Sequence, residues 1–96
     1  MSSKAELSEL EAAVLEAVDA IPEGQVRSYG DIADELGCSP RQVGRIMALF
    51  GASSNWWRVV RADGTSAVAE RAKAYWAKEG IAHAERGVSP KMLRRP

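Results

Sequence analysis

Two closely spaced helix starts constrain the fold of this chain more than any other feature of its sequence. Each is a capping box, in which a serine hydroxyl and a side chain three residues later bond reciprocally to backbone amides: Ser28 with Asp31, and Ser39 with Gln42. Pro40 at the first helical position strengthens the second start, and Gly37 suits the left-handed end of the first helix. We therefore predict helices over 29–36 and 40–50 joined by a tight turn, which is the helix-turn-helix pattern.

The predicted helix 40–50 separates its apolar and basic residues onto opposite faces. Its apolar side chains recur at i, i+3, i+4 and i+7 and mark the expected buried face: Val43, Ile46, Met47 and Phe50. Arg41 and Arg45 lie one turn apart on the outward face, beside Gly44, where the missing side chain lets another backbone come close. Arg41 is also in the first turn, where free amides favour phosphate. The pattern indicates nucleic-acid contact, although helix-turn-helix units also serve as plain packing units.

Amphipathic helices are predicted on both sides of this unit. Ser8 with Glu11 forms a third capping box before an apolar stripe. The first helix should end near Ala20, because Pro22 disfavours helical backbone at the residue before it. A last helix, ending before Gly80, is predicted from four apolar residues at helical spacing: Val68, Ala72, Tyr75 and Trp76. Its two aromatic residues, Tyr75 and Trp76, are assigned to the core.

The fold class that follows is mainly α, a winged helix-turn-helix-like domain. Residues 57–61 can be extended, and Asp63-Gly64 after them is a hairpin-turn signal, so we expect at most a small two-stranded β wing. We interpret residues 1–96 as a single domain, because a chain of this size has room for one core. Residues 81–96 are expected to form a basic, partly ordered tail whose apolar residues pack back on the body: Val88 and Leu93.

The composition is typical of an intracellular globular protein. Hydrophobic residues make up 46% of the chain and charged residues 27%, and no apolar run approaches the ~20 residues of a membrane span. A single cysteine, Cys38, excludes an internal disulfide, and with a single histidine, His83, the chain lacks the ligands of a structural zinc site. The first residues do not resemble a secretory signal. We expect a cytoplasmic protein, nucleoid-associated if prokaryotic, that needs no metal or cofactor and does not contact membranes.

The charge is distributed unevenly, although the formal net charge is zero. Residues 1–35 hold nine acidic and two basic residues, whereas residues 36–96 hold eleven basic and four acidic ones. Nine of the thirteen basic residues are arginine, which is suited to phosphates and base edges. This polarity favours a polyanionic partner for the second part of the chain.

Two adjacent tryptophans, Trp56 and Trp57, form the most unusual local feature. They precede Arg58, Val59 and Val60. Tryptophan is costly to leave in water, and its N–H needs a partner when it is buried. The pair therefore lines either a core or a pocket, and the residues alone leave both alternatives open.

Three motifs occur in a specific order and spacing between about residue 13 and residue 80. They are the segment 21–33 (IPEGQVRSYGDIA), the segment 40–44 (PRQVG), and Trp56-Trp57-Arg58-Val59-Val60 with Asp63-Gly64. Together they resemble the DNA-binding domain of O6-alkylguanine-DNA alkyltransferases, and more closely the alkyltransferase-like proteins. The resemblance implies that domain's winged helix-turn-helix-like fold.

The resemblance also argues against catalysis. In the alkyltransferases the last motif is Pro-Cys-His-Arg-Val, and its cysteine takes the alkyl group from a flipped guanine. Here Asn55, Trp56 and Trp57 stand at the proline, cysteine and histidine. Tryptophan offers neither a thiolate nor an acid–base group, and Cys38 lies in the turn between the two helices. We therefore expect no catalytic residues, no alkyl transfer and no enzyme.

The resemblance implies a set of DNA-contacting residues. Tyr29 matches the tyrosine that turns the phosphate of the flipped nucleotide. Arg41 matches the arginine that fills the gap left in the base stack, and Gly44 the small residue that allows minor-groove approach. The set is completed by three polar neighbours of Arg41 on the same helix start and outward face: Ser39, Gln42 and Arg45.

A second set belongs to the lesion pocket that the resemblance implies. Trp56 is expected to be its wall, and Arg58 to brace the loop. The set also includes two apolar residues, for which a core position is the alternative: Met47 and Val60. Trp57 is interpreted as a packing residue. The segment between Gly64 and the last helix is short and lacks the small-residue motif that walls the pocket in the family.

The function implied is recognition of double-stranded DNA containing O6-alkylguanine. The damaged base would be flipped into the pocket without transfer of its alkyl group, and the site flagged for nucleotide excision repair proteins. We expect a monomer. The alternative is a small winged-helix regulator that reads sequence in the major groove with Arg41 and Arg45. An enzyme, such as a glycosylase, is disfavoured because no nucleophile or acid–base pair lies near the pocket motif.

Overall fold

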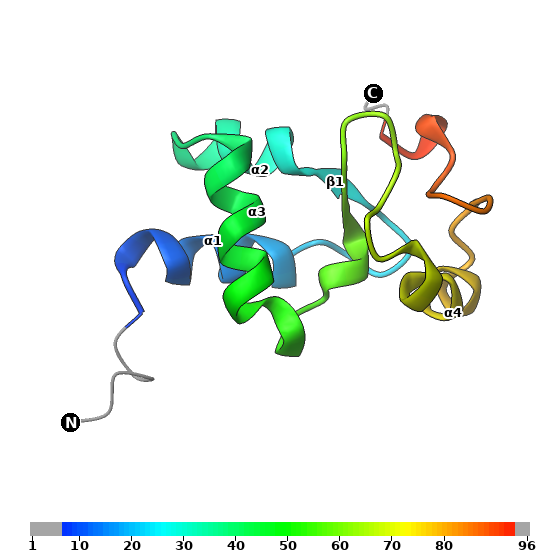
Figure 1. Ribbon diagram of the computed structural model, residues 1–96, viewed down its shortest axis with the longest axis horizontal. Helices are drawn as coiled ribbons and strands as arrows, with labels where there is room; N and C mark the ends of the chain where they lie inside the picture. The colour runs from blue at the N-terminus through cyan, green and yellow to red at the C-terminus, as the bar shows by residue number, and fades with distance from the viewer. Residues whose placement is uncertain (1–6, 94–96) are drawn as a thin grey trace.

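The computed structural model describes residues 7–93 as an elongated molecule of 43 × 25 × 21 Å with helices gathered at both ends (Figure 1). Three helices occupy one end: α1 (Glu9–Asp19), α2 (Tyr29–Leu36) and α3 (Pro40–Phe50). Their starts are the three predicted capping boxes, with Ser8, Ser28 and Ser39 as caps. Gly37 ends α2 in the left-handed conformation, with φ of 73°. The helix-turn-helix prediction is confirmed.

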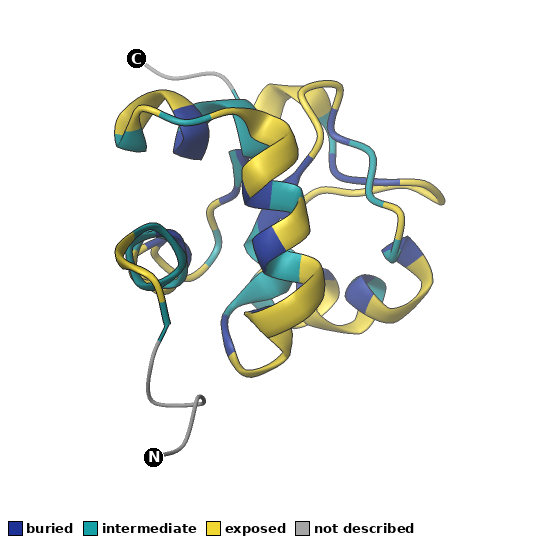
Figure 2. Cartoon of the chain, turned by 60° about the vertical axis from the view of Figure 1, so that its left-hand side comes forward, coloured by how far each residue is buried: buried dark blue, intermediate teal, exposed yellow. Residues whose placement is uncertain are grey.

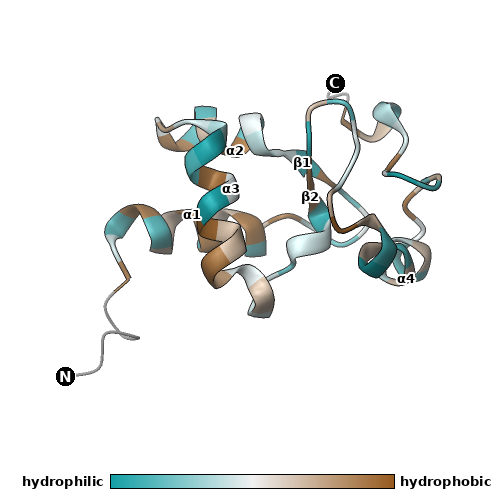
Figure 3. Cartoon of the chain, in the orientation of Figure 1, coloured by the Kyte–Doolittle hydropathy of each residue, from teal (hydrophilic) through white to brown (hydrophobic). Residues whose placement is uncertain are grey.

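The three helices enclose the first of two hydrophobic clusters. Its buried members come from all three helices, from the turn after α1 and from one later strand: Val14, Val18, Ile21, Ile32, Ala33, Val43, Ile46 and Val59. Hydrophobic and hydrophilic segments alternate along α3, as its helical period requires (Figure 3). Phe50 departs from the predicted buried face, because 37% of its surface is exposed at the last turn of α3.

The second cluster lies at the other end of the molecule, around α4 (Ala69–Glu79). Trp76 is its largest fully buried side chain, and its indole N–H donates to the carbonyl of Trp57 at 2.7 Å. The prediction that Tyr75 is also a core residue is wrong, because Tyr75 is 41% exposed. Part of the predicted basic tail belongs to this cluster, since Val88 is buried in it and Leu93 packs against it. Residues 94–96 of the tail lie outside the described residues.

The sheet consists of β1 (Arg27–Ser28) and β2 (Val59–Val60), which pair in parallel. The prediction of an extended segment over 57–61 with a hairpin wing is corrected in two ways. Trp56–Arg58 forms a 3-10 helix, and β2 pairs with β1, far away in the sequence, rather than with a hairpin partner. Asp63-Gly64 does form a turn, because the Gly64 amide donates to the Arg61 carbonyl at 2.8 Å. The parallel pair joins the two ends of the molecule.

The segment after α4 braces the turn that follows β2. The amide of Val88 donates to the carbonyl of Gly64 at 2.9 Å, and the amide of Ser66 donates to the carbonyl of Arg86 at 3.0 Å. A 3-10 helix, Pro90–Leu93, follows. None of the helices in the described part of the chain is both long and apolar enough to cross a membrane.

Candidate nucleic-acid interface

A cleft of about 580 Å³ opens where α2, α3 and α4 approach one another. Its size falls within the range of small-ligand sites in proteins. The lining is mostly apolar or small and comes from the start of α2, one side of α3, the two 3-10 helices before β2, and the start of α4: Tyr29, Gly44, Met47, Ala48, Gly51, Ala52, Trp56, Ala67, Val68 and Arg71. The cleft therefore brings together predicted residues from all three sequence motifs.

Trp56 forms an aromatic wall of this cleft. It is half-buried, and two aromatic rings meet it edge-on: Tyr75 at 5.3 Å between ring centroids and Trp57 at 5.7 Å. The guanidinium of Arg71 lies 5.4 Å from the centroid of the Trp56 ring. Arg71 is the one charged side chain among the described lining residues. It was not predicted, because nothing in the sequence shows how α4 is turned toward the cleft.

Arg58 and Val60 do not line the cleft, so their inclusion in the pocket set is corrected, whereas the bracing role expected of Arg58 and the core alternative for Val60 agree with the structure. Val60 is fully buried in the second cluster. Arg58 forms an ion pair with Glu79, and its guanidinium donates to the carbonyl of Ile21 at 2.9 Å. Arg58 thus connects the turn after α1 with α4, behind the cleft. Met47 does line the cleft and also packs against the first cluster.

Glu79 is a second functional candidate that the sequence did not reveal. Its side chain is 8% exposed and accepts hydrogen bonds from Arg58, from the Gly24 amide at 3.0 Å and from the Trp57 indole at 2.9 Å. Burial alone would raise the pKa of Glu79, but these hydrogen bonds and the charge of Arg58 outweigh it and lower the pKa to about 2. Glu79 is therefore ionised at neutral pH.

Tyr29 is the first residue of α2 and lines the cleft. Burial raises the pKa of the Tyr29 phenol, and the positive charge of Arg61 offsets part of that rise. The hydroxyl is therefore protonated at neutral pH and can donate a hydrogen bond. A phosphate oxygen is a fitting acceptor for such a donor at the mouth of an apolar cleft.

The predicted residues of α3 divide into capping, exposed and cleft-lining groups. Ser39 and Gln42 bond to each other's backbone amides at 3.1 and 2.9 Å and form the N-terminal cap. Arg41 and Arg45 are exposed on the outward side of α3, which Figure 2 shows largely covered by exposed residues. Gly44 lines the cleft, and a Cβ built on it would meet nothing within 4 Å. The open approach expected at Gly44 is thus present.

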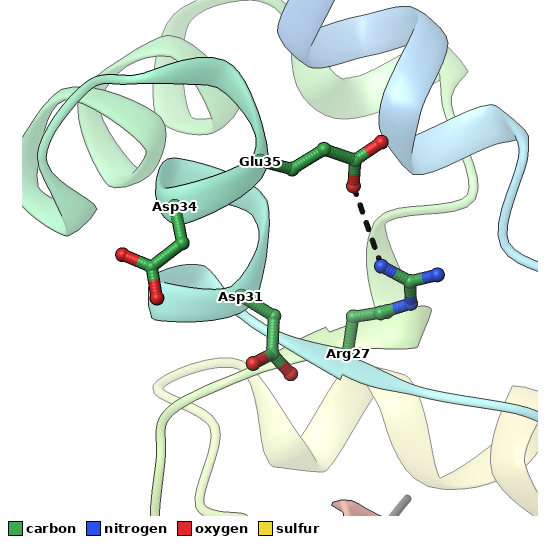
Figure 4. A pocket seen from close by; sticks show the side chains of 4 residues that line it. All are labelled: Arg27, Asp31, Asp34 and Glu35. Atoms are coloured by element: carbon green, nitrogen blue, oxygen red, sulfur yellow. Dashed lines mark hydrogen bonds and ion pairs between the residues drawn. The ribbon is translucent and has the colours of Figure 1, made fainter.

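A polar pocket beside α2 has the opposite character. Asp31, Asp34 and Glu35 line it together with Arg27, whose guanidinium lies 3.4 Å from a Glu35 carboxylate oxygen (Figure 4). With three carboxylates and one arginine the lining of this pocket is net acidic, which disfavours a phosphate backbone. A nucleic acid therefore fits the side of α3 and the cleft better than this side of α2. Cys38, in the turn before α3, packs against the first cluster and is not part of the cleft lining.

Comparisons with known proteins agree with this arrangement. The profile of the 6-O-methylguanine DNA methyltransferase DNA-binding domain matches residues 9–87. No curated protein sequence matches significantly. A crystal structure of S. pombe Atl1 in complex with damaged DNA containing O6-carboxymethylguanine superposes with a TM-score of 0.79 and 29% identity, over 94% of this chain and 98% of that one.

Two further solved structures extend the comparison. S. pombe ATL in complex with DNA has a TM-score of 0.72 and 31% identity, over 94% of this chain and 98% of that one. The O6-methylguanine-DNA methyltransferase of the archaeon Pyrococcus kodakaraensis has a TM-score of 0.62 and 31% identity, over 78% of this chain and 48% of that one. The chain therefore belongs to the family defined by the DNA-binding domain of 6-O-methylguanine DNA methyltransferase, as an alkyltransferase-like member.

Proposed function

We propose that this chain binds double-stranded DNA containing O6-alkylguanine, holds the extruded base in the cleft and leaves the alkyl group in place. The observation that carries the proposal is the wall of the cleft: Trp56 lines it at the position where the alkyltransferase motif has cysteine. The likeness to S. pombe Atl1, which was solved with O6-carboxymethylguanine in DNA, supports the same ligand class for this chain.

The extruded base gains its binding energy from stacking in this proposal. Extruding a base costs a few kcal/mol, and less when alkylation has already weakened its pairing. Stacking on an aromatic ring returns roughly 1–3 kcal/mol per base. The face of Trp56 offers that surface, and the small side chains of Gly51, Ala52 and Ala67 leave room for a substituted purine. The ring and its small neighbours thus suit an alkylated base better than a polar ligand.

Two residues assist extrusion. Arg41, exposed in the first turn of α3, enters the DNA through the minor groove and replaces the lost stacking, as side-chain wedges do. The Tyr29 hydroxyl donates a hydrogen bond to the phosphate of the extruded nucleotide. Gly44 keeps α3 slim enough for the backbone to approach. The role of Arg41 rests on its exposure and that of Gly44 on the open space beside it, and both rest on the family resemblance.

The proposal does not include a chemical step. An indole provides no nucleophile and no acid–base group, and the Glu79 carboxylate is occupied by Arg58 and Trp57. Because the alkyl group stays in place, another activity has to remove the lesion. We extend the proposal to nucleotide excision repair proteins as the downstream partners, with the chain acting as a monomer.

The test is equilibrium binding to matched duplexes that differ only by O6-methylguanine or guanine at one position, at fixed salt, because salt alone changes affinity strongly. We expect tighter binding to the alkylated duplex and, after prolonged incubation, unchanged DNA and an unmodified protein mass. Equal affinities would overturn the proposal and favour a regulator that reads base sequence. Restored guanine, or a protein heavier by one alkyl group, would identify an enzyme instead.

A further inference from the structure

A hydrogen-bond network centred on Glu79 includes two direct sequence neighbours of the Trp56 wall, Trp57 and Arg58. Glu79, at the end of α4, receives hydrogen bonds from two segments that are far from it in the sequence: the turn after α1 through Gly24, and the 3-10 helix through Trp57 and Arg58. The carboxylate is largely buried and ionised. A buried charge with several donors fixes the geometry of every group around it.

Trp57 is half-buried and makes several directional contacts in this network. Its indole N–H donates to Glu79 at 2.9 Å, and its carbonyl accepts from the Trp76 indole at 2.7 Å. Its ring stacks on Tyr75, with centroids 4.1 Å apart and planes inclined by 16°. The Arg58 guanidinium lies 5.3 Å from the Trp57 ring centroid. Ring rotation would break the hydrogen bond and the stacking together.

The fixed ring of Trp57 determines where Trp56 can lie. The two rings meet nearly at right angles, at 88°, and Tyr75 meets Trp56 at 72°. Edge-to-face pairs of this kind are directional. Trp56 therefore packs edge-on against a stacked pair of rings, in which the Trp57 ring is hydrogen-bonded to Glu79 and the Tyr75 ring is stacked on Trp57.

We propose that Trp57 and Glu79 are positioning residues, which hold Trp56 at the angle needed to stack on the alkylated base. This inference rests on the proposed function, because it assigns the angle of Trp56 to lesion binding. Neither residue lines the cleft. Their effect on the base is transmitted through Trp56, so it should concern the preference for damaged DNA and not the general attraction to DNA.

The test compares wild type with Trp57→Phe, which retains an aromatic ring beside Tyr75 but removes the N–H donor to Glu79. We expect the ratio of affinities for O6-methylguanine and guanine duplexes to fall about fivefold to tenfold, because Trp56 keeps its ring but loses its fixed angle to the base. Affinity for the guanine duplex should change less than about twofold. Near-ultraviolet circular dichroism should also change, since the coupling of the rings depends on their angles.

Two further variants make the test decisive. Glu79→Gln keeps the side-chain shape but removes the charge, and it should lower the same affinity ratio. It replaces Trp57→Phe in the test if that variant folds poorly. Val88→Ala, in the second cluster but outside the network, controls for lost stability alone. A folded Trp57→Phe protein with the wild-type ratio, or an equal loss in Val88→Ala, would overturn this inference only. Equal affinities of the wild type for both duplexes would overturn the proposed function as well.

Discussion

At the scale of single residues, Glu79 shows how one carboxylate can tie a binding wall to the rest of the fold. It is 8% exposed, and its partners Arg58 and Trp57 belong to the same 3-10 helix as Trp56. A buried ion pair adds little stability relative to a pair of apolar residues in its place, but removing only one partner is strongly destabilising because the other charge stays buried. We therefore expect the packing of the 3-10 helix that carries Trp56 to depend on Glu79.

Glu79→Ala should lower the free energy of unfolding by about 3–5 kcal/mol at neutral pH, because it leaves Arg58 without its partner. Denaturant unfolding measures this change. The matched control is Glu85→Ala, which removes an exposed carboxylate paired with Lys73 and should cost far less, because solvent screens that pair. Equal losses in the two variants would contradict the role assigned to the Glu79 network.

The pH dependence of stability should carry the signature of Glu79. Its pKa in the folded chain is about 2, below the ordinary value of 4.5. The stabilisation is therefore fully present above about pH 4.5 and is lost as the pH falls toward 2. Glu79→Gln should lose less stability than wild type across this range in unfolding titrations. Parallel curves for the two proteins would refute the assignment.

Single residues also show what the sequence can and cannot predict about the site. Trp56 was predicted as a pocket wall because a motif with fixed spacing surrounds it, and it does line the cleft. Arg71 and Glu79 were missed, because both act from α4, and no local signal shows which side of that helix faces the 3-10 helix. For Val60 the sequence leaves pocket and core open, because a strand residue beside a pocket motif can face either way, and the structure places Val60 in the core.

At the scale of elements, α3 combines a strongly specified start with a face that has no side chain at its middle. The capping box of Ser39 and Gln42 fixes where the helix begins, and Gly44 gives it a side without a side chain in its middle. A glycine there costs about 1 kcal/mol of helix stability relative to alanine. Since a Cβ at Gly44 would meet nothing within 4 Å, the fold itself does not require glycine.

Gly44→Ala should therefore raise the free energy of unfolding by about 0.5–1 kcal/mol while weakening DNA binding. The added methyl group would project at the cleft, where we propose that DNA comes close. Thermal unfolding and duplex binding of the same preparation test both parts. Stronger stability with unchanged affinity would show that the DNA backbone does not approach Gly44.

The two exposed arginines of α3 should differ in effect. Arg41→Ala is expected to weaken binding to the O6-methylguanine duplex more than Arg45→Ala, because Arg41 lies in the first turn and is assigned to the gap in the base stack. Each substitution removes one positive charge, so each serves as the other's electrostatic control. The reverse order of losses would favour a regulator that reads the major groove.

The elements themselves were predictable to the extent that their signals are local. Each of the three capping boxes spans four residues and marks a helix start, and the glycines after α2 and α4 mark the ends of those helices. The pairing of β1 with β2 joins segments separated by α2 and α3, and it depends on packing, not on any local turn. The hairpin predicted at Asp63-Gly64 failed for that reason.

At the scale of the whole molecule, charge and shape place the acidic and the DNA-facing sides apart. Residues 1–35 carry a large excess of acidic residues and residues 36–96 an excess of basic ones. The carboxylates beside α2 gather in the pocket of Figure 4, while Arg41 and Arg45 are exposed on α3. A polyanion is thus steered toward α3 and the cleft rather than to α2.

The cleft itself lies where the two ends of the molecule meet, so both hydrophobic clusters contribute to its walls.

The most direct test of the account is the lesion preference of Trp56→Ala, measured with the O6-methylguanine and guanine duplexes at one salt concentration. Phe50→Ala, which removes an exposed aromatic ring outside the cleft lining, is the matched control. We predict that Trp56→Ala lowers affinity for the alkylated duplex about tenfold or more and changes affinity for the guanine duplex less than about twofold. An unchanged preference, or an equal loss for both duplexes in a folded protein, would contradict the claim that Trp56 holds the alkylated base.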